Sequence, residues 1–469
     1  MAIEVNLKRG LDRKQWEMCN YAPSGTTIGS FIVSSNLPDQ YQFYVTSSTT
    51  AFLYDPFEDG WMSLPSPAMG GTFGAGSCGA RHPWGPSGFA TAGTTTTLTT
   101  NLNIQRSLKG YSIRIIAGPN AGVTATIKSN TIGTNSVITL EETMSTAFTT
   151  ASEYILITGR VWFLNGGTQS GTTFKYYDVA LNTWVATPVS TGLPATIATD
   201  GKLISTPGYL EDFASGTATS ATSTTIVNSA KTWTTNNWAN YQVRIKAGTG
   251  AGQIRSISSN TATTLTVSPS WTITPDSTSQ YVIEGNSDYI YFMGNNAVAL
   301  YRYSISANTW TLLSPGTARA GAPGAGMSAH WVWDVSDPDW SNESNYLNGR
   351  YIYSFRGGGS SAIDRYDIAA NAWSVVPYSP GVETFTTGTS YNYTENFIYI
   401  HQISPMGRIL KYNIAQSRLE PFGQLWYGQS TTHLGDRLFD VSVTEGDTKL
   451  QWLYTLTHNQ NTLFRIMIF

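Results

Sequence analysis

Apolar and aromatic residues occur along this chain in short runs that alternate with polar residues at a period of two. Examples are YQFYV from Tyr41, VWFL from Val161, YIYF from Tyr289 and WLYTL from Trp452. This period places successive side chains on opposite faces of a β-strand, and the run lengths fit ordinary strands. Because runs of the helix-forming residues Ala, Glu, Lys and Leu are nearly absent, the pattern predicts an all-β protein.

A fixed spacing accompanies these strands, in which a tyrosine is followed seven residues later by a tryptophan. The turn between them is indicated by asparagines such as Asn182 and Asn308, which suit tight connections. Aspartates beside the tyrosines, Asp55, Asp178 and Asp367, are interpreted as acceptors for backbone N–H groups of the turn. The pairs are Tyr54 and Trp61, Tyr177 and Trp184, Tyr303 and Trp310, and Tyr366 and Trp373, with a weaker copy at Tyr412 and Leu419.

Repeats of roughly 40 to 50 residues that hold four short strands each are typical of a β-propeller. The order found here is an apolar strand, often paired glycines such as Gly166 and Gly167, then Tyr-Asp and then Trp. This order resembles the kelch repeat. With Phe464 counted as the sixth tyrosine-like marker, the sequence predicts a six-bladed kelch-like propeller.

Two gaps between the markers are longer than the others and contain a duplicated segment. YSIRIIAGPNAGVTATI starts at Tyr111 and YQVRIKAGTGAGQIRSI at Tyr241, an offset of 130 residues (241 − 111 = 130). We therefore expect two homologous small β domains, residues 90–159 and 213–285, inserted in equivalent loops of adjacent blades. The remaining propeller segments would be 29–89 for blade 1 and the start of blade 2, 160–212 for blade 2 and the start of blade 3, and 286–469 for blades 3 to 6.

The glycine-rich segments AGPNAG and AGTGAG invite comparison with phosphate-binding loops. A phosphate loop directs backbone N–H groups from a strand-to-helix junction, whereas the residues after Gly252 alternate polar and apolar like a strand. Gly250 in one copy corresponds to Asn120 in the other, and both residue types readily adopt a positive φ. We interpret both segments as hairpin turns.

The second duplicated segment has two tryptophans five residues apart, then GTGAGQIR, then TTLTV. This combination resembles a small β module of tailed-bacteriophage virion proteins. The resemblance implies a protein that assembles with other virion proteins in the host cytoplasm, in multiple symmetric copies. The first copy has Val123 and Ala125 in place of Gln253 and Arg255, so a shared polar role for these side chains is not expected.

The composition of the chain argues against nucleic-acid binding, membrane insertion and export. Charged residues make up 12% of the 469 residues and the formal net charge is −3, so no basic stripe for nucleic acid is indicated. No window of 18 apolar residues predicts membrane insertion, and the N-terminus lacks the apolar run of a signal peptide. Cys19 and Cys78 do not make a disulfide framework, so we expect folding in a reducing cytosol.

The sixth repeat lacks an outer strand, because seven residues after Phe464 would be position 471. Ring closure removes exposed sheet edges, so within residues 1–28 we expect AIEVNL, residues 2–7, to supply this strand. Residues 8–28 would then form an arm, with these possible docking residues: Arg9, Arg13, Lys14 and Trp16.

The five histidines do not have the spacing of a metal site, and the sequence contains no nucleophile-elbow motif. We therefore expect neither a metal nor another cofactor. The least repetitive segment runs from His330 to Gly359 and mixes tryptophans with charged residues. Aromatic rings can stack on sugars, so this segment could contact a glycan or a protein partner; alternatively its tryptophans pack between blades. The candidate contact residues are Trp331, Trp333, Asp334, Trp340 and Arg356. The same alternatives apply to Arg81 and Trp84.

These features favour a non-enzymatic virion structural protein of a neck, tail, baseplate or fibre, acting as an assembly or decoration scaffold. One alternative is a receptor-binding adhesin that recognises bacterial surface glycan. A second alternative is a glycan-degrading enzyme, which would need two carboxylates facing each other across a cleft.

Overall fold

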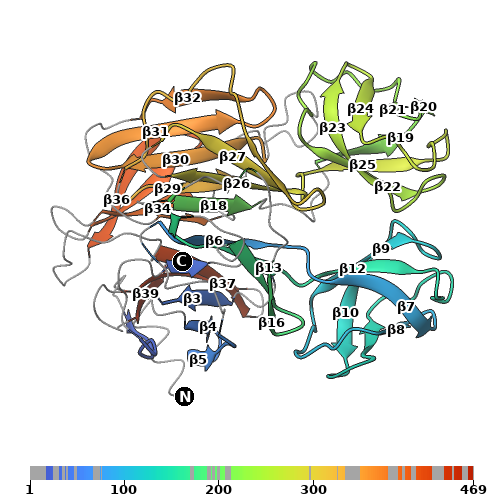
Figure 1. Ribbon diagram of the computed structural model, residues 1–469, viewed down its shortest axis with the longest axis horizontal. Helices are drawn as coiled ribbons and strands as arrows, with labels where there is room; N and C mark the ends of the chain where they lie inside the picture. Colours follow the sequence, from blue (N-terminus) through green and yellow to red (C-terminus); the bar gives the residue numbers. More distant parts are fainter. Residues whose placement is uncertain are drawn as a thin grey trace.

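The structure, a computed structural model, contains strands and turns and no helix among the residues it describes (Figure 1). No described helix is therefore long and apolar enough to cross a membrane. The described residues are 17–469 apart from 25–30, 34–36, 38–40, 47–49, 67–73, 75, 169–173, 187–191, 193–195, 198–200, 206–212, 295–296, 325, 333–348, 379–388, 393–396, 403–407, 425–437, 446–447, 457–462 and 468–469.

Six four-stranded antiparallel sheets form the blades of a β-propeller, which confirms the predicted all-β class and blade number. Blade 1 has β2 (Phe31–Val33), β3 (Gln42–Val45), β4 (Ala51–Asp55) and β5 (Gly60–Ser63); blade 2 has β6 (Cys78–His82), β13 (Arg160–Leu164), β15 (Phe174–Asp178) and β16 (Thr183–Ala186); blade 3 has β18 (Gly201–Ser205), β26 (Tyr289–Gly294), β27 (Leu300–Ser304) and β28 (Thr309–Leu312). Blade 4 has β29 (Ser328–Val332), β30 (Tyr351–Gly357), β31 (Ser360–Asp367) and β32 (Ala372–Val376); blade 5 has β33 (Thr389–Asn392), β34 (Phe397–Gln402), β35 (Arg408–Asn413) and β36 (Arg418–Gln424); blade 6 has β37 (Leu438–Glu445), β38 (Thr448–Leu456), β39 (Leu463–Met467) and β1 (Glu17–Met18).

The ring is built from the first strand of each blade. These strands, β2, β6, β18, β29, β33 and β37, lie beside one another in that order. Blade 6 returns to blade 1 through aromatic packing, since the rings of Tyr54 and Tyr454 lie 5.9 Å apart. Apolar side chains between neighbouring blades form the core, as where Phe31 of blade 1 meets Phe163 of blade 2 at 5.7 Å.

The outer strand of blade 6 comes from the N-terminal part of the chain, at a different place from the one expected. Glu17 pairs with Arg465 and Met18 with Phe464, so β1 lies within residues 8–28, which we had assigned to an arm. That assignment was wrong for residues 17 and 18, because the local pattern of AIEVNL carries no information on which distant strand it pairs with. Residues 2–7 and the possible docking residues Arg9, Arg13, Lys14 and Trp16 lie outside the described residues.

The spacing of seven between Tyr and Trp is set by the hairpin that joins the third and fourth strands of a blade. Tyr303 and Trp310 are opposite each other across this hairpin. The residue five positions after the tyrosine has a positive φ, 50° at Asn308, and it accepts a 2.8 Å hydrogen bond from the tyrosine hydroxyl. The same arrangement occurs at Tyr54 with Asp59, Tyr177 with Asn182, and Tyr366 with Asn371.

The aspartates beside the tyrosines accept backbone hydrogen bonds within the same turns, as predicted. Asp367 Oδ1 accepts the N–H of Ala370 at 2.9 Å, and Asp55 Oδ1 accepts the N–H of Phe57 at 2.9 Å. Asp178 acts in the same way. The recurrence of these carboxylates is therefore explained by the hydrogen bonds that they accept within the turns.

Two further β units occupy the connections between the first and second strands of blades 2 and 3. We name them module 1 and module 2. Module 1, a closed barrel between β6 and β13, consists of β7 (Ser87–Gly93), β8 (Thr97–Thr100), β9 (Ser112–Ala117), β10 (Thr124–Asn130), β11 (Val137–Leu140) and β12 (Glu153–Ile157). Module 2, between β18 and β26, consists of β19 (Ala214–Thr217), β20 (Ser220–Thr222), β21 (Thr225–Val227), β22 (Gln242–Ala247), β23 (Ile254–Asn260), β24 (Thr264–Ser268) and β25 (Gln280–Glu284).

The two modules share one strand arrangement. In module 1, β7 pairs with both β12 and β8 and so closes the barrel. In module 2, the same place is taken by two short strands, β19 on β25 and β20 on β21. The modules lie side by side on one flank of the propeller, with β9 and β22 on their facing sides (Figure 1). The remaining described strands are β14 (Gly167–Thr168) and β17 (Thr196–Ile197), which pair with each other.

Candidate functional site: the junction of the two modules

The glycine-rich segments are hairpin turns that touch each other across the module junction. Asn120 has a φ of 65° and Gly250 a φ of 79°, which confirms the predicted positive φ at this position in both copies. A Cβ atom placed on Gly122 would lie 2.2 Å from the carbonyl oxygen of Lys246, and one on Gly252 would lie 2.1 Å from that of Ile116. Only glycine permits such close backbone approach, so both turns are shaped by the opposite module.

Three charged side chains meet in the buried centre of this junction. Glu284 accepts hydrogen bonds from Arg244 of its own module at 2.8 and 2.9 Å, and from Arg114 of module 1 at 3.1 and 3.2 Å. The Glu284 side chain is 0% exposed, and those of Arg114 and Arg244 are 2% and 8% exposed. Although burial opposes its charged form, the two guanidinium groups hold the pKa of Glu284 below its usual value.

The cluster continues into the propeller through a chain of hydrogen bonds. Gln242 donates to Glu284 at 2.9 Å and accepts from the backbone N–H and the hydroxyl of Ser287, both at 2.9 Å. The carbonyl oxygen of Ser287 lies 2.6 Å from Nε2 of His82, which belongs to the innermost strand of blade 2. Blade 2 and both modules are thus joined by one buried polar network.

His82 must be neutral in this network. Its Nδ1 accepts the backbone N–H of Trp84 at 3.2 Å, so Nε2 carries the proton and donates it to the Ser287 carbonyl. Burial of the imidazole lowers the pKa of His82 to about 3, and the nearby Arg160 acts in the same direction. His82 ends β6, and the residues that follow it lead into β7 of module 1.

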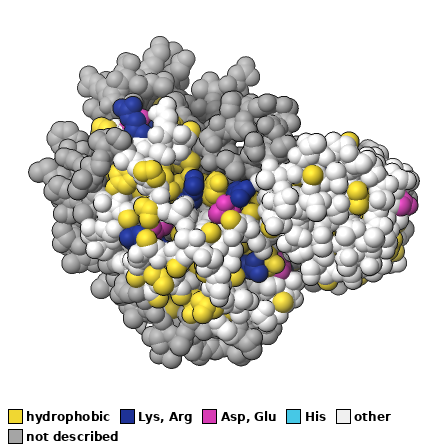
Figure 2. All heavy atoms as spheres, turned by 90° about the horizontal axis from the view of Figure 1, so that it is seen from above, with side chains coloured by type: hydrophobic (Ala, Val, Ile, Leu, Met, Phe, Trp, Pro, Cys, Tyr) yellow, Lys and Arg dark blue, Asp and Glu magenta, His cyan; other side chains and the backbone are white. Residues whose placement is uncertain are grey.

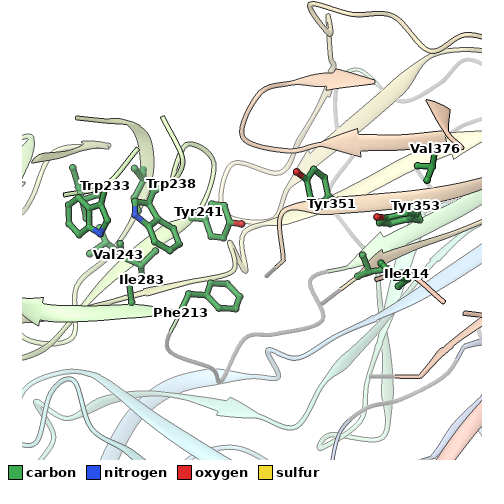
Figure 3. Packing of buried hydrophobic residues seen from close by; sticks show 14 of the residues in the cluster. Phe213, Trp233, Trp238, Tyr241, Val243, Ile283, Tyr351, Tyr353, Val376 and Ile414 are labelled. Carbon is green, nitrogen blue, oxygen red and sulfur yellow. The ribbon is translucent and has the colours of Figure 1, made fainter. Parts of the chain in front are cut away.

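Module 2 is also anchored on blades 3 and 4. Asn240 donates to the carbonyl oxygen of Ile368 at 2.9 Å and accepts from Arg302 at 3.0 Å, while Asn237 accepts from Arg350. One cluster of buried apolar side chains includes residues of both module 2 and the propeller. Figure 3 shows members of this cluster on the two sides, Phe213, Trp238 and Tyr241 in module 2 and Tyr351 and Tyr353 in blade 4. Burial of each such aromatic side chain contributes roughly 1.5 to 3 kcal/mol, so this packing stabilises module 2 in its position on the propeller.

Module 1 contacts the turn of its own blade. Arg106 donates to the hydroxyl of Tyr177 at 3.0 Å and to Oδ1 of Asn182 at 3.2 Å. The backbone N–H of Gln105 donates to the carbonyl oxygen of Ala180 at 2.9 Å. The Tyr177–Asn182 hairpin of blade 2 therefore also forms a contact surface for module 1.

The residues that the sequence singled out for glycan contact are only partly described. Trp333, Asp334 and Trp340 lie outside the described residues. Trp331 is 3% exposed, its Nε1 donates to the carbonyl oxygen of Gly349 at 2.5 Å, and its ring packs against Tyr291. Of the two alternatives for Trp331, surface contact is therefore wrong and packing between blades is found, since its ring lies in the apolar cluster between blades 3 and 4.

Arg356 and Arg81 have internal partners as well. Arg356 forms a two-pronged ion pair with Asp364, at 2.9 and 2.7 Å, and Asp364 also accepts from the buried Arg319 at 2.7 Å. Arg81 is buried and donates to the carbonyl oxygen of Thr158 at 3.0 Å. Trp84 is half-buried beside His82.

Gln253 and Arg255 form hydrogen bonds with the loop between β24 and β25 of module 2. Gln253 Oε1 accepts the N–H groups of Thr272 and Ile273, at 2.8 and 3.0 Å, and Arg255 donates to Ser270 O at 2.9 Å. The absence of a shared polar role, expected from the replacements in module 1, agrees with this local function.

Arg114, Arg244, Glu284 and His82 were not identified from the sequence. The available signal was a lone charge inside an apolar strand, as in YSIRII, YQVRIK and YVIEG, in a chain with few charges. A buried charge needs a partner, but strand pattern alone does not indicate which distant strand provides it. Among the described residues no group of three or more His, Cys, Asp or Glu side chains could hold a metal ion.

No protein-family model matches the chain, and no curated protein matches it. Among solved structures, a chain from "Crystal Structure of Mitotic Checkpoint Complex" aligns with a TM-score of 0.38 and 9% sequence identity, over 97% of this chain and 95% of that chain.

Proposed function

We propose that this protein is a structural component of a bacteriophage particle that acts without catalysis, through protein–protein contacts. The proposal begins with the second duplicated segment, whose sequence resembles modules of tailed-bacteriophage virion proteins. Its main structural support is the buried network of Arg114, Arg244, Glu284, Gln242 and His82, which joins propeller and modules into one body. A rigid, asymmetric body of this kind suits a component that must hold neighbours at fixed positions.

One face of the projecting lobe also fits such a role. In the face drawn in Figure 2, the lobe on the right is covered mainly by neutral polar side chains and backbone, with few charged or hydrophobic groups. Interfaces of this type form many hydrogen bonds of modest strength, and they become strong when repeated in a symmetric assembly. Other virion proteins in multiple copies are accordingly the proposed partners, and the virion the proposed location.

Glycan recognition receives less support. Of the candidate stacking residues, Trp331 is buried in the propeller core, and Arg356 is bound to Asp364. The Trp331 ring is therefore not available for stacking on a sugar, and the Arg356 guanidinium is already engaged by a carboxylate. We therefore do not extend the proposal to an adhesin or a glycan-degrading enzyme.

The proposal is tested by mass spectrometry of density-purified particles from the bacteriophage that encodes the chain. We expect its peptides at a fixed ratio to the major capsid protein across the particle fractions. An abundant phage protein that is not part of the particle provides the contamination control. If the chain is absent from particles, or no more abundant than that control, the proposed function is wrong.

The place of the modules in the particle is tested by cross-linking mass spectrometry on the same material. We expect cross-links from Lys109 and Lys128 of module 1, or from Lys231 of module 2, to other virion proteins. Cross-links restricted to residues within this chain would contradict a bridging role of the modules.

A further inference from the structure

The hairpin between the third and fourth strands has the same backbone form in five blades, but one exposed side chain sets blade 1 apart. Five residues after the tyrosine marker, φ is 47° at Asp59 and lies between 48° and 51° in the other four blades. In blade 1, the residue three positions after the marker is Phe57, which is 51% exposed. The other four blades have alanine or serine at this position: Ala180, Ser306, Ala369 and Ala415. The turn itself therefore does not need a large side chain there.

Phe57 belongs to a hydrophobic patch at the seam where blade 6 meets blade 1. The backbone N–H of Asn20 donates to the two carboxylate oxygens of Asp59, at 3.1 and 3.2 Å, and Nε1 of Trp61 donates to the carbonyl oxygen of Asn20 at 3.3 Å. These bonds hold residues 17–22 against the hairpin that carries Phe57. Exposed hydrophobic side chains that gather in this way mark an interaction site. We name them the seam patch, whose members are Met18 (59% exposed), Tyr21 (57%), Phe57 (51%) and Met62 (41%).

The turn that presents Phe57 is fixed by hydrogen bonds within the chain. Asp55 Oδ1 accepts the backbone N–H groups of Phe57 and Glu58, at 2.9 and 3.3 Å. Asp59 Oδ1 accepts the hydroxyl of Tyr54 at 2.8 Å. A side chain on a preorganised turn loses little conformational freedom on binding, and buried aromatic rings often supply much of the binding energy of an interface. Phe57 is therefore placed as an anchor residue.

Two equivalent turns already bind the β modules within the chain. In blade 2, Ala180 is 0% exposed and lies in the apolar cluster of module 1, and its carbonyl oxygen accepts the N–H of Gln105 at 2.9 Å. In blade 4, the carbonyl oxygen of Ile368 accepts Nδ2 of Asn240 of module 2 at 2.9 Å. A small side chain at this position lets a module lie close to the turn, whereas the exposed Phe57 ring needs a partner with a pocket.

The charge around the seam patch is one-sided. Between Lys14 and Arg81 the sequence contains no lysine or arginine. It contains five carboxylates over the same span, and the last three lie in the hairpin that carries Phe57: Glu17, Asp39, Asp55, Glu58 and Asp59. From blade 6, Arg465 pairs with Glu17 at 3.2 Å. Because complementary charges steer and orient association, this acidic surface favours a partner with basic side chains.

We propose that the seam patch binds another virion protein, which offers an apolar pocket for the Phe57 ring and lysine or arginine side chains around that pocket. This rests on the proposed function, because the partner is a component of the same particle. It gives the protein a contact surface on blade 1 in addition to that of the modules.

The first test places the photoreactive amino acid benzoylphenylalanine at position 57 of the full chain during infection by the bacteriophage that encodes it. The matched control carries it at position 312, because Leu312 is 55% exposed on blade 3. After irradiation of purified particles, we expect position 57, and not position 312, to be linked to another virion protein. Links only to a second copy of this chain, or no more links from position 57 than from position 312, would overturn the proposal.

Mass spectrometry of the same particles distinguishes this failure from failure of the proposed function. If the unchanged chain is absent from the particles, both proposals are wrong. If it is present and position 57 gives no links to other virion proteins, only the binding role of the seam patch is wrong.

The second test uses Phe57→Ala, which should fold normally because three other blades have alanine at this position. Phe57→Ala and the control Leu312→Ala each compete with the unchanged chain for incorporation into particles. We expect incorporation of Phe57→Ala to be lower by about tenfold or more, since loss of an anchor side chain weakens binding by at least this factor. Urea denaturation should give both variants the midpoint of the unchanged chain.

The charge of the partner is tested in the same competition with Glu58→Lys. This variant places a positive charge next to Phe57, so a basic partner should incorporate it less than Leu312→Ala. If Phe57→Ala or Glu58→Lys were incorporated as well as Leu312→Ala, the seam patch would not bind a partner of this kind.

Discussion

The hydroxyl of Tyr303 donates a 2.8 Å hydrogen bond to Oδ1 of Asn308, which holds a φ of 50° in the turn between β27 and β28. Asparagine suits this position for two reasons. It tolerates the left-handed backbone conformation, and its side-chain oxygen accepts a hydrogen bond from the tyrosine hydroxyl. We predict that Asn308→Ala lowers the free energy of unfolding by roughly 1 to 2 kcal/mol, since alanine loses the hydrogen bond and is strained at this φ.

The control for this prediction is Asn308→Asp, since Asp59 fills the same position in blade 1 and accepts from Tyr54. Urea denaturation followed by tryptophan fluorescence measures both variants. The denaturation midpoint of Asn308→Asp should be nearly that of the unchanged chain. A third variant, Asn308→Gly, should have a midpoint between those of Asn308→Asp and Asn308→Ala, because glycine keeps the backbone conformation but loses the hydrogen-bond acceptor. Equal midpoints for Ala and Asp would show that the hydrogen bond and the φ are unimportant.

Glu284 forms ion pairs with both Arg114 and Arg244, and its side chain is 0% exposed. Replacement by glutamine removes the buried negative charge that both guanidinium groups contact. We predict that Glu284→Gln destabilises the protein by about 3 to 5 kcal/mol, the range for breaking a buried ion pair. Thermal unfolding monitored by circular dichroism measures the change.

Glu420→Gln is the matched control, because Glu420 forms a longer pair with Arg418, at 3.7 Å, with both side chains substantially exposed. An exposed pair contributes at most about 1 kcal/mol, so this variant should unfold almost like the unchanged chain. A similar loss in both variants would argue that the buried cluster at the module junction contributes no more than a surface pair.

His82 makes stability depend on pH. Its pKa is lowered from 6.5 to about 3 in the folded protein, so as pH falls below 6.5 the unfolded chain binds a proton that the folded chain does not. Stability is therefore full above pH 6.5 and is lost progressively as pH falls toward 3, by up to about 5 kcal/mol at 1.36 kcal/mol per pKa unit.

The contribution of His82 is isolated by comparison with His82→Gln, since glutamine can donate to the Ser287 carbonyl but does not titrate. We expect the difference in unfolding free energy between the two proteins to change with pH between 6.5 and 3, with the variant losing less stability on acidification. Parallel pH profiles would exclude His82 as the titrating group, because carboxylates elsewhere affect both proteins equally.

Local patterns in the sequence were sufficient for features that depend on neighbouring residues. The Tyr–Trp spacing marked the outer hairpins because Tyr303, Asn308 and Trp310 interact within a single turn. The positive φ of Asn120 and Gly250 followed from the same kind of reasoning. Blade count followed from repetition of these local units.

Features that depend on distant residues were missed. The pairing of Glu17 with Arg465 spans almost the whole chain, and two residues are too few to give a strand signal. The partners Arg114 and Glu284 lie in different modules, and each appears in the sequence as one charge in an apolar run. For the same reason the sequence left open whether Trp331 faces solvent or the core.

The burial of Trp331 leads to a prediction that separates a structural from a recognition role. Its Nε1 donates to the carbonyl oxygen of Gly349, whereas Nε1 of the equally buried Trp310 has no hydrogen-bond partner among the described residues. Both tryptophan-to-phenylalanine variants remove a similar volume from the core, but only Trp331→Phe leaves a buried carbonyl group without its donor. We predict that Trp331→Phe lowers stability by about 1 kcal/mol more than Trp310→Phe, the usual net contribution of one hydrogen bond.

Chemical denaturation of the two variants provides the comparison, and binding to an array of bacterial surface glycans provides the functional readout. If Trp331 has a structural role only, Trp331→Phe should show the extra loss of stability and should give the same glycan-array signal as the unchanged chain. The opposite result would be a Trp331→Phe variant that is as stable as Trp310→Phe and selectively loses a glycan signal. Trp331 would then contact glycan at the surface, which would contradict its buried position in the core.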